Sequence, residues 1–246
     1  MITNNLKKYF KDKKSFTRNE LFEFYLNNEK KLNGNTFAWR IYSLKKKGII
    51  KEIGRGLYSF RDKKNYVLKL NKSSKKIINA VSRNFTDITF CISESSWINE
   101  FTTHQYSNNF IILEIEKDFI ESVFYNLKEK FKTVFLKPNE IELERYISGL
   151  DVAIILVPLL TRAPIQKSGD KKYHIPTLEK LLVDIYGKSS PYFFLTDSEI
   201  ATIIKSAFRK YGINQTTLLA YAERRGKKSK IKSYLIEKNL LESAND

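Results

Sequence analysis

The spacing of apolar residues near the start of the chain predicts two short helices. Thr17 and Glu20 have the three-residue spacing of a capping box and precede an apolar run, so a helix should begin near Arg18. A second helix should follow, with Asn35 or Thr36 as its N-cap. Its core side is predicted from the helical spacing of four apolar residues: Phe37, Ala38, Ile41 and Leu44.

A β-hairpin is predicted directly after the second helix. Gly48 follows a triplet of lysines, at a position where helices commonly end in a left-handed glycine. The runs IIKEI and LYSF have strand-like patterns, and the GRG between them supplies a tight turn with Arg55 at its tip. Together with a short first helix around NNLKKYF, this order predicts a winged helix-turn-helix over residues 1–64.

The rest of the chain, residues 65–246, has a mixed pattern. Strand-like runs occur at DITFCIS, FIILEIE, KTVFLKP and DVAIILVPLL, and helical patterns occur at 119–131 and 176–186. Beyond Thr196 and Glu199, which form another capping box, three amphipathic helices should make a small bundle. The predicted fold class is therefore α+β: an N-terminal winged helix-turn-helix followed by a larger mixed α/β domain that ends in helices.

Charge is distributed unevenly along the sequence. The 246 residues carry a formal net charge of +17. Residues 1–76 contain 21 Lys and Arg against 6 Asp and Glu, a net charge of +15. Such an asymmetry is typical of a small nucleic-acid-binding module joined to a domain with another role. We therefore expect double-stranded DNA as the partner, and a merely solvated basic surface is the alternative.

The second helix and the hairpin turn carry the candidate DNA contacts. Thr36, Arg40 and Ser43 share the helix side opposite the predicted core, where hydrogen-bonding groups could meet base edges in the major groove. Lysines at the end of the helix and the arginine at the wing tip should contact phosphates. The full predicted set is Asn35, Thr36, Trp39, Arg40, Ser43, Lys45, Lys46, Lys47 and Arg55.

Signatures of enzyme chemistry are weak. With two histidines and one cysteine, a His/Cys metal site is not expected, and the sequence has no HExxH, CxxC or Walker-type loop. Asp151 begins a pattern that in nucleotidyltransferases has a second carboxylate two positions on, but Ala153 stands there. The glutamates of LEIEKDF are best interpreted as residues on the solvent-exposed face of a strand or helix. We therefore expect no catalytic residue, no metal and no cofactor.

The expected cellular compartment is inferred from signals that do not occur in the sequence. The single Cys91 cannot form an internal disulfide, and the first residues have no apolar core of a signal peptide. The longest apolar run, VAIILVPLL, is far shorter than the roughly 20 residues of a membrane-spanning helix. A cytoplasmic protein without a membrane segment is expected.

Several motifs together resemble a known family. The winged helix ending in GRGLYSF, then CISESSWINEF, TRAP at 161–164, and IPTLEKLLVDI at 175–185 resemble the AbiE-type antitoxins of bacterial type IV toxin–antitoxin systems. The resemblance implies a protein that represses its own operon through the N-terminal module. It also implies a C-terminal domain that counteracts a nucleotidyltransferase-like toxin, with or without binding it directly.

The resemblance places candidate residues for antitoxin activity or ligand contact in the second half of the chain: Thr161, Arg162, Thr177, Glu179 and Asp184. Each also has a structural interpretation. Thr177 can cap a helix, and Glu179 and Asp184 can be charges on its surface. Arg162, which follows a very apolar strand, should be exposed, paired with Glu179 or Asp184, or directed at a ligand.

Two other functions remain open from the sequence. One is a DNA-directed nuclease or nucleotide-handling enzyme carried by the same winged helix. The other is a C-terminal half that serves only as a protein-docking module. The sequence shows no coiled coil, although short inverted repeats in an operator would let two copies bind side by side.

Overall fold

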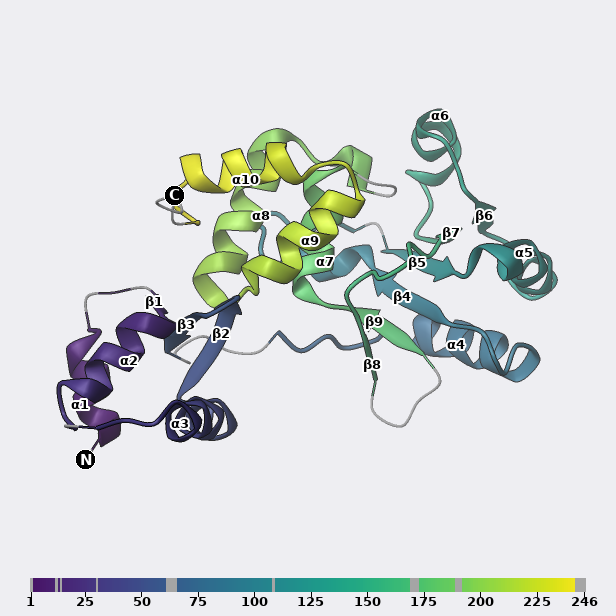
Figure 1. The fold of residues 1–246 in the computed structure, drawn as a ribbon. Coiled ribbons are helices and arrows are strands. Elements are labelled where there is room, and N and C mark those ends of the chain that lie inside the picture. The colour runs from purple at the N-terminus through teal and green to yellow at the C-terminus, as the bar shows by residue number, and fades with distance from the viewer. Residues whose placement is uncertain are drawn as a thin grey trace. The chain divides into compact units, whose positions relative to one another are not determined.

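A computed structural model of the chain describes residues 2–11, 13, 15–29, 31–60, 66–107, 109–168, 173–188 and 192–241 (Figure 1). Its contacts divide the chain into two compact units. The first comprises Met1–Asn65 together with Phe208–Thr217, and the second comprises Tyr66–Ala207 together with Leu218–Asp246. The boundary expected at 64/65 lies outside the described residues. The segment Phe208–Thr217, expected in the second domain, makes its contacts in the first.

The first unit contains three helices and a small antiparallel sheet. The elements follow the chain as α1 (Ile2–Tyr9), β1 (Phe16–Thr17), α2 (Arg18–Leu26), α3 (Gly34–Lys46), β2 (Ile50–Gly54) and β3 (Leu57–Phe60). The strands lie in the order β1-β3-β2. A core of buried apolar side chains joins the helices to the sheet, among them Leu6, Phe10, Phe16, Leu21, Phe24, Phe37, Ile41 and Tyr58.

Local chemistry accounts for the ends of α2 and α3. The predicted capping box is confirmed: the Thr17 side chain accepts a hydrogen bond from the Glu20 amide, and the Glu20 carboxylate accepts one from the Thr17 amide. The predicted N-cap of α3 is wrong by two or three residues. Asn33 takes this role, because its backbone is extended and its Oδ1 accepts the amide of Asn35 at 2.9 Å. Gly48 has a φ of 66°, which confirms the predicted left-handed helix stop.

The second unit is built around a six-stranded mixed sheet. The strands are β4 (Phe90–Glu94), β5 (Asn109–Ile115), β6 (Val134–Leu136), β7 (Val152–Pro158), β8 (Ile165–Lys167) and β9 (His174–Pro176). They lie in the order β6-β7-β5-β4-β9-β8. The four strand-like runs of the sequence are confirmed as β4 to β7, whereas β8 and β9 were not predicted. Each of the latter has only three residues, too few for a period-2 pattern.

Helices α4 (Lys72–Asn84) and α5 (Ile120–Lys128) cover one face of the sheet (Figure 1). Their apolar residues pack against Ile111, Leu113 and Ile115 of β5. Since side chains alternate along a strand, Phe110, Ile112 and Glu114 face the opposite side. That side carries α7 (Leu178–Tyr186), because Lys180 of this helix bonds to Glu114. Asp151 immediately precedes β7, as predicted for a residue at a strand end.

The polar segment after β4 has a structural role. Glu94 is buried, and its Oε1 accepts hydrogen bonds from the Asn71 amide and the Ser74 hydroxyl at the start of α4. Ser95 Oγ accepts the amide of Phe110. The remaining short elements are α6 (Glu140–Glu142), a π-helical turn at Leu143–Ile147 and 3-10 turns at Ser95–Glu100, Lys117–Phe119 and Tyr192–Phe194.

Three helices follow, as predicted: α8 (Asp197–Lys210), α9 (Gln215–Arg224) and α10 (Lys228–Glu237). The second capping box is confirmed, because the amides of Thr196 and Glu199 each donate to the other's side chain. Gly226, with a φ of 64°, follows the end of α9. In the described part of the chain, no helix has the length and apolar character needed to cross a bilayer. The protein is thus of mixed α and β structure with a helical C-terminal region.

Candidate functional site

A stripe of exposed residues runs along α3. Asn35, Trp39, Tyr42 and Lys46 are spaced four, three and four residues apart, so they share one side of the helix. All four are exposed, and Trp39 and Tyr42 retain 67% and 61% of their accessible surface. The stripe lies opposite the buried side of the helix. Exposed aromatic side chains occur elsewhere in this chain as well, but two of them together on one side of a basic helix are consistent with a contact surface.

The stripe differs from the predicted polar face. Thr36, Arg40 and Ser43 lie at the flank, with Thr36 exposed and Arg40 and Ser43 half-buried. Ala38, predicted in the core, is exposed. Tyr42 was missed altogether. The apolar positions Phe37, Ile41 and Leu44 alone define the buried side, and the inclusion of Ala38 rotated the predicted outer face away from its true position.

Arg40 is engaged within its own unit. Its Nη2 donates a hydrogen bond to Glu29 Oε2 at 3.0 Å, and its Nη1 lies 2.9 Å from Glu29 Oε1. Its guanidinium also lies over the ring of Tyr25, 4.8 Å from the centroid. An ion pair stacked on an aromatic ring holds the guanidinium in place. A contact between Arg40 and a base, as predicted, would require this pairing to open.

The lysines at the end of α3 are not equivalent. Lys45 forms an ion pair with Glu52 of β2, which neutralises a charge that was expected to meet a phosphate. Lys46 and Lys47 are exposed, and no ion pair to either occurs among the described residues. The free cationic charge of this helix end is therefore carried by Lys46 and Lys47.

Arg55 occupies the hairpin turn, as predicted. Its side chain is exposed, and Gly56 after it has a φ of 68°, a conformation that favours glycine. The Arg55 amide donates to Thr216 Oγ1 at 3.1 Å, and Lys51 of β2 donates to the carbonyl oxygen of Gly212. Residues from the second half of the chain thus hold the main chain of the hairpin.

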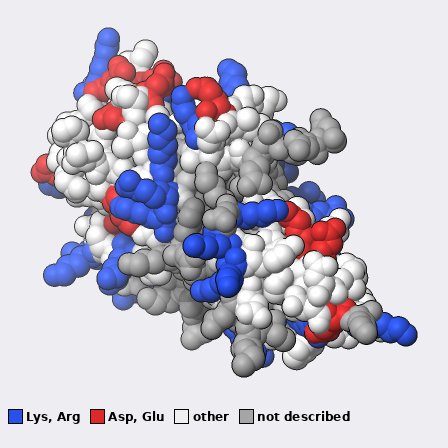
Figure 2. All heavy atoms as spheres, turned by 90° about the vertical axis from the view of Figure 1, so that its left-hand side faces the viewer, with Lys and Arg blue, Asp and Glu red and all other residues white. Residues whose placement is uncertain are grey.

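Figure 2 shows one face of the molecule with its charges. Lys and Arg side chains project from this face, and groups of Asp and Glu lie between them. The positive charge on this face is therefore interspersed with carboxylates.

A cluster of buried charges lies under α7 in the second unit. Thr177 caps this helix through its hydroxyl oxygen, as predicted, and the next turn places Lys180 toward the sheet with 1% of its surface exposed. Lys180 Nζ lies 2.6 Å from Glu114 Oε1 and 2.7 Å from Asp184 Oδ2. A buried ammonium between two carboxylates satisfies charges that would otherwise be very costly to bury.

Asp184 contacts three other members of this cluster. Besides Lys180, its Oδ1 accepts a hydrogen bond from the Tyr221 hydroxyl at 3.0 Å and lies 3.2 Å from Nη2 of Arg225. The expectation of surface charges on this helix is wrong, because Asp184 is 9% and Glu179 is 8% exposed. Tyr221 of α9 and Arg225, which follows this helix, contact Asp184 and help to bury a position that the sequence pattern places at the surface.

Burial controls the ionisation of the cluster. It raises the pKa of Glu114, an effect that Lys180 opposes and Asp184 strengthens. Burial alone would lower the pKa of Lys180, yet Asp184 and Glu114 together hold this pKa well above its usual value. Burial and the nearby Asp184 raise the pKa values of Tyr192 and Tyr221. Lys180 therefore stays protonated near neutral pH and does not act as an acid there.

Thr161 and Arg162 form the turn after β7 and are both exposed. Arg162 has a φ of 57°, and Thr161 Oγ1 accepts a hydrogen bond from Arg224. The predicted pairing of Arg162 with Asp184 is not formed, since Asp184 is bound by Lys180, Tyr221 and Arg225 instead. The side chain of Arg162 makes no ion pair with any residue that the structure describes.

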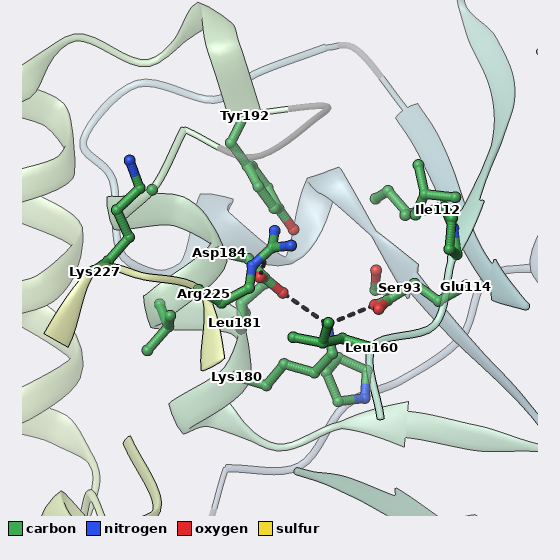
Figure 3. A pocket seen from close by; sticks show the side chains of 15 residues that line it. Ser93, Ile112, Glu114, Leu160, Lys180, Leu181, Asp184, Tyr192, Arg225 and Lys227 are labelled. Carbon is green, nitrogen blue, oxygen red and sulfur yellow. Dashed lines mark hydrogen bonds and ion pairs between the residues drawn. The ribbon is translucent and has the colours of Figure 1, made fainter. Parts of the chain in front are cut away.

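A pocket of about 500 Å³ opens beside the buried cluster (Figure 3). Its polar wall includes Glu114, Lys180, Asp184, Tyr192 and Arg225. Its apolar wall consists of side chains from β5, β7, β9, α7 and the loop after β7: Ile112, Val157, Pro158, Leu160, Pro176, Leu181 and Val183. In Figure 3 the Tyr192 hydroxyl points toward the Arg225 guanidinium and the Asp184 carboxylate.

The donor set does not fit a divalent cation. A metal would need both carboxylates, but the Lys180 ammonium lies between them and takes their charge. Across the described ranges, no group of three or more His, Cys, Asp and Glu side chains is arranged to hold a metal.

Two members of this cluster, Glu114 and Lys180, were not predicted as site residues. The expectation that Glu114 lies on a solvent-exposed face is wrong, because Glu114 is 7% exposed and is bound by Lys180. The signal for Glu114 is present in the sequence, because a carboxylate inside FIILEI interrupts an otherwise apolar strand and requires a buried partner. The signal for Lys180 is its i, i+4 spacing to Asp184. The sequence does not show that Glu114 and Lys180 are close in space, because 66 positions separate them along the chain.

Fold and pocket define the chain as a mixed α/β protein with a basic N-terminal unit and a buried charge cluster in its larger unit. A family model matches residues 36–241, and the chain belongs to that family, described as "Family of unknown function (DUF6577)". No curated protein matches it. One similar solved structure is that of the antibiotic-resistance factor ANT(2'')-Ia, with 10% identity and a TM-score of 0.33 over 68% of this chain and 92% of that one. A likeness this distant carries no functional argument.

Proposed function

We propose that this protein is a DNA-binding antitoxin of the AbiE type. In this proposal the N-terminal unit binds the operator of its own operon as a repressor. The larger unit counteracts a nucleotidyltransferase-like toxin encoded beside it.

The exposed stripe of α3 is the observation that carries the DNA-binding half. The order α1, β1, α2, α3, β2, β3 with a three-stranded antiparallel sheet is typical of a winged helix-turn-helix, in which α3 is the recognition helix and β2–β3 the wing. The side chains of Asn35, Trp39, Tyr42 and Lys46 are exposed and take no part in the core of the unit. They can therefore enter the major groove of DNA.

The proposed contacts follow from exposure and pairing. Asn35 and Thr36 are placed to hydrogen-bond base edges, and Trp39 and Tyr42 to make apolar contact with thymine methyl groups or sugars. Lys46, Lys47 and Arg55 supply phosphate contacts. Arg40 instead positions α3 against α2 through Glu29, and Lys45 ties α3 to the hairpin through Glu52.

The antitoxin part of the proposal rests on two motifs that resemble those of the AbiE-type antitoxins. TRAP forms the turn after β7, and IPTLEKLLVDI runs from β9 into α7. The side chains of Lys180 and Asp184 from the second motif hold the buried cluster together, while Thr161 and Arg162 from the first are exposed. On this basis Arg162 is the best candidate for a contact that relieves toxicity.

The decisive experiment is binding of the purified protein to the DNA upstream of its own reading frame, with a scrambled DNA of equal length as control. Tight binding to the upstream DNA alone supports repression. Equal and weak binding to both overturns it. The intrinsic fluorescence of Trp39 offers a second readout, because Trp39 is exposed whereas Trp97 is 8% exposed. Protection of Trp39 from acrylamide by upstream DNA, absent in a Trp39→Phe variant, places α3 at the interface.

The antitoxin half is tested separately by co-expression with the neighbouring toxin. Rescue of growth by the wild type, and by a Lys46→Ala/Lys47→Ala variant with weakened DNA binding, separates neutralisation from repression. Failure of the wild type to rescue overturns the antitoxin assignment but leaves DNA binding intact. Loss of rescue in Arg162→Ala, with an unchanged melting temperature, supports a contact at Arg162.

The competing enzyme hypothesis is tested with the same protein. A nuclease would cleave plasmid DNA or RNA with Mg²⁺ or Mn²⁺. The pairing of Glu114 and Asp184 with Lys180 argues against such a site in this pocket. Metal-dependent cleavage that a Glu114→Gln change abolishes would reverse this conclusion.

A further inference from the structure

The hydroxyl group of Tyr192 is a polar group of the pocket that makes no hydrogen bond within the described part of the protein. Tyr192 is 3% exposed and lines the pocket, and its hydroxyl has no hydrogen-bond partner among the described residues. A buried hydroxyl without a partner costs free energy that a tyrosine in a core normally avoids. Phenylalanine would fill the same place without that cost, so the hydroxyl indicates a partner that enters the pocket.

The Lys180 ammonium adds a second unused donor. An ammonium has three N–H groups, and two of them are used, by Glu114 and Asp184. Lys180 lines the same pocket as Tyr192. Both donors belong to the lining of one pocket, which Figure 3 draws from close by.

Both carboxylates of the pocket already have cationic partners inside the protein. Asp184 accepts hydrogen bonds from Lys180 and Tyr221 and forms an ion pair with Arg225, and Glu114 accepts a hydrogen bond from Lys180. The wall also holds three cations, Lys180, Arg225 and Lys227, against two carboxylates. The balance of charge and of donors therefore favours a ligand with anionic oxygen atoms.

The apolar part of the lining indicates the rest of the ligand. Seven of the lining residues are apolar or proline side chains, and the space of about 500 Å³ is that of a small-molecule site. A lining that combines hydrogen-bond donors with apolar side chains suits a molecule with an anionic head and a flat or hydrocarbon body.

We propose that this pocket binds a small organic anion, a carboxylate or phosphate carried on an apolar or ring-shaped body. The anionic head accepts hydrogen bonds from the Tyr192 hydroxyl and the Lys180 ammonium, beside Arg225. The body packs against Leu160, Val157 and Ile112. This inference does not depend on DNA binding or on a toxin.

Four probes test the proposal with the full-length protein. Phenyl phosphate and benzoate carry the same ring with the two candidate heads, benzyl alcohol carries the ring with a neutral head, and inorganic phosphate is the phosphate head alone. Binding is followed by amide chemical shifts and by calorimetry. The proposal requires that phenyl phosphate or benzoate bind and perturb residues of the pocket, and that benzyl alcohol bind much more weakly. The stronger of the two acids identifies the head group.

Matched variants assign the contact. Tyr192→Phe should weaken binding of the preferred acid by about tenfold, the effect of one hydrogen bond to a charged group. Tyr234→Phe is the control, because its hydroxyl is also buried without a partner among the described residues but lies outside this pocket. Lys227→Gln should weaken binding without disturbing the buried cluster.

Three outcomes would overturn the inference. The first is an absence of binding by either acid at millimolar concentrations. The second is equal binding of benzyl alcohol, which would show that the anionic head is not recognised. The third is equal affinity in the wild type and Tyr192→Phe, both folded by circular dichroism, which would show that the hydroxyl makes no contact.

Discussion

Lys180 on α7 and Glu114 on β5 are joined by a hydrogen-bonded ion pair of 2.6 Å, although 66 positions separate them in the sequence. The pair is buried, and through Asp184 it extends to Tyr221 and Arg225 at the other end of the cluster. A helix, a strand and the C-terminal region thus share one set of charges. The stability of the larger unit should depend on this cluster more than on any exposed ion pair.

Replacement of Lys180 by methionine tests this dependence. The change fills a similar volume but leaves Glu114 and Asp184 buried without their cation, so the free energy of unfolding should fall by about 3–5 kcal/mol. Denaturant unfolding measures the change.

Lys205→Met on α8 is the matched control, because Lys205 is exposed and its loss should be nearly neutral. Adding Glu114→Gln to Lys180→Met should recover part of the stability, since it removes one unpaired charge. A loss below about 1 kcal/mol for Lys180→Met would show that the ion pair does not stabilise the fold.

The capping box of α2 should make the N-terminal unit sensitive to acid. The hydrogen bond from Lys13, followed by that from the Thr17 amide, lowers the pKa of Glu20 below 4.5. A carboxyl whose folded pKa is lowered stabilises the protein above its unfolded pKa, and this contribution is lost as pH falls through the folded pKa. Melting temperature should therefore depend less on pH between pH 5 and 3 in Glu20→Gln than in the wild type.

Glu23→Gln, on the same helix but outside the cap, controls for the loss of a carboxylate. If Glu20→Gln and the wild type lose stability in parallel as the pH falls, the capping box does not contribute to acid sensitivity.

Two adjacent lysines of α3 should differ in DNA binding. Lys46→Ala removes an exposed cation, so binding should weaken on all DNA sequences and the salt slope should fall by about one unit. Lys45→Ala should change the slope less, because Glu52 already neutralises Lys45. Fluorescence anisotropy over a salt series measures both slopes. Identical slopes for the two variants would mean that the Lys45–Glu52 pair opens on DNA.

Arg40 should act on the fold instead of on base recognition. Arg40→Ala loses the ion pair with Glu29 and the stacking on Tyr25, which should cost about 1 kcal/mol of stability. Its effect on DNA should be of equal size for upstream and scrambled sequences. A selective loss on the upstream DNA, with unchanged melting temperature, would restore Arg40 as a base-reading residue.

The sequence predicted the parts of this fold that depend on neighbours along the chain. Capping boxes at Thr17 and Thr196, the cap at Thr177 and the left-handed Gly48 all follow from interactions within a few residues. Long apolar runs such as that of β7 are equally local signals. The short strands β8 and β9 escaped prediction because pairing with other strands, not their own pattern, makes them strands.

The sequence by itself determined the order of two helices and a hairpin within residues 18–60, the basic N-terminal part and the position of Arg55 at the hairpin turn. Only the tertiary structure decided which charges are free, because a pair such as Arg40–Glu29 or Lys45–Glu52 depends on distances between elements. It also decided that Asp184 is buried, since Tyr221 of α9 and Arg225, which follows this helix, contact it. The physical reason is that burial and ion pairing are set by three-dimensional proximity, which local periodicity does not encode.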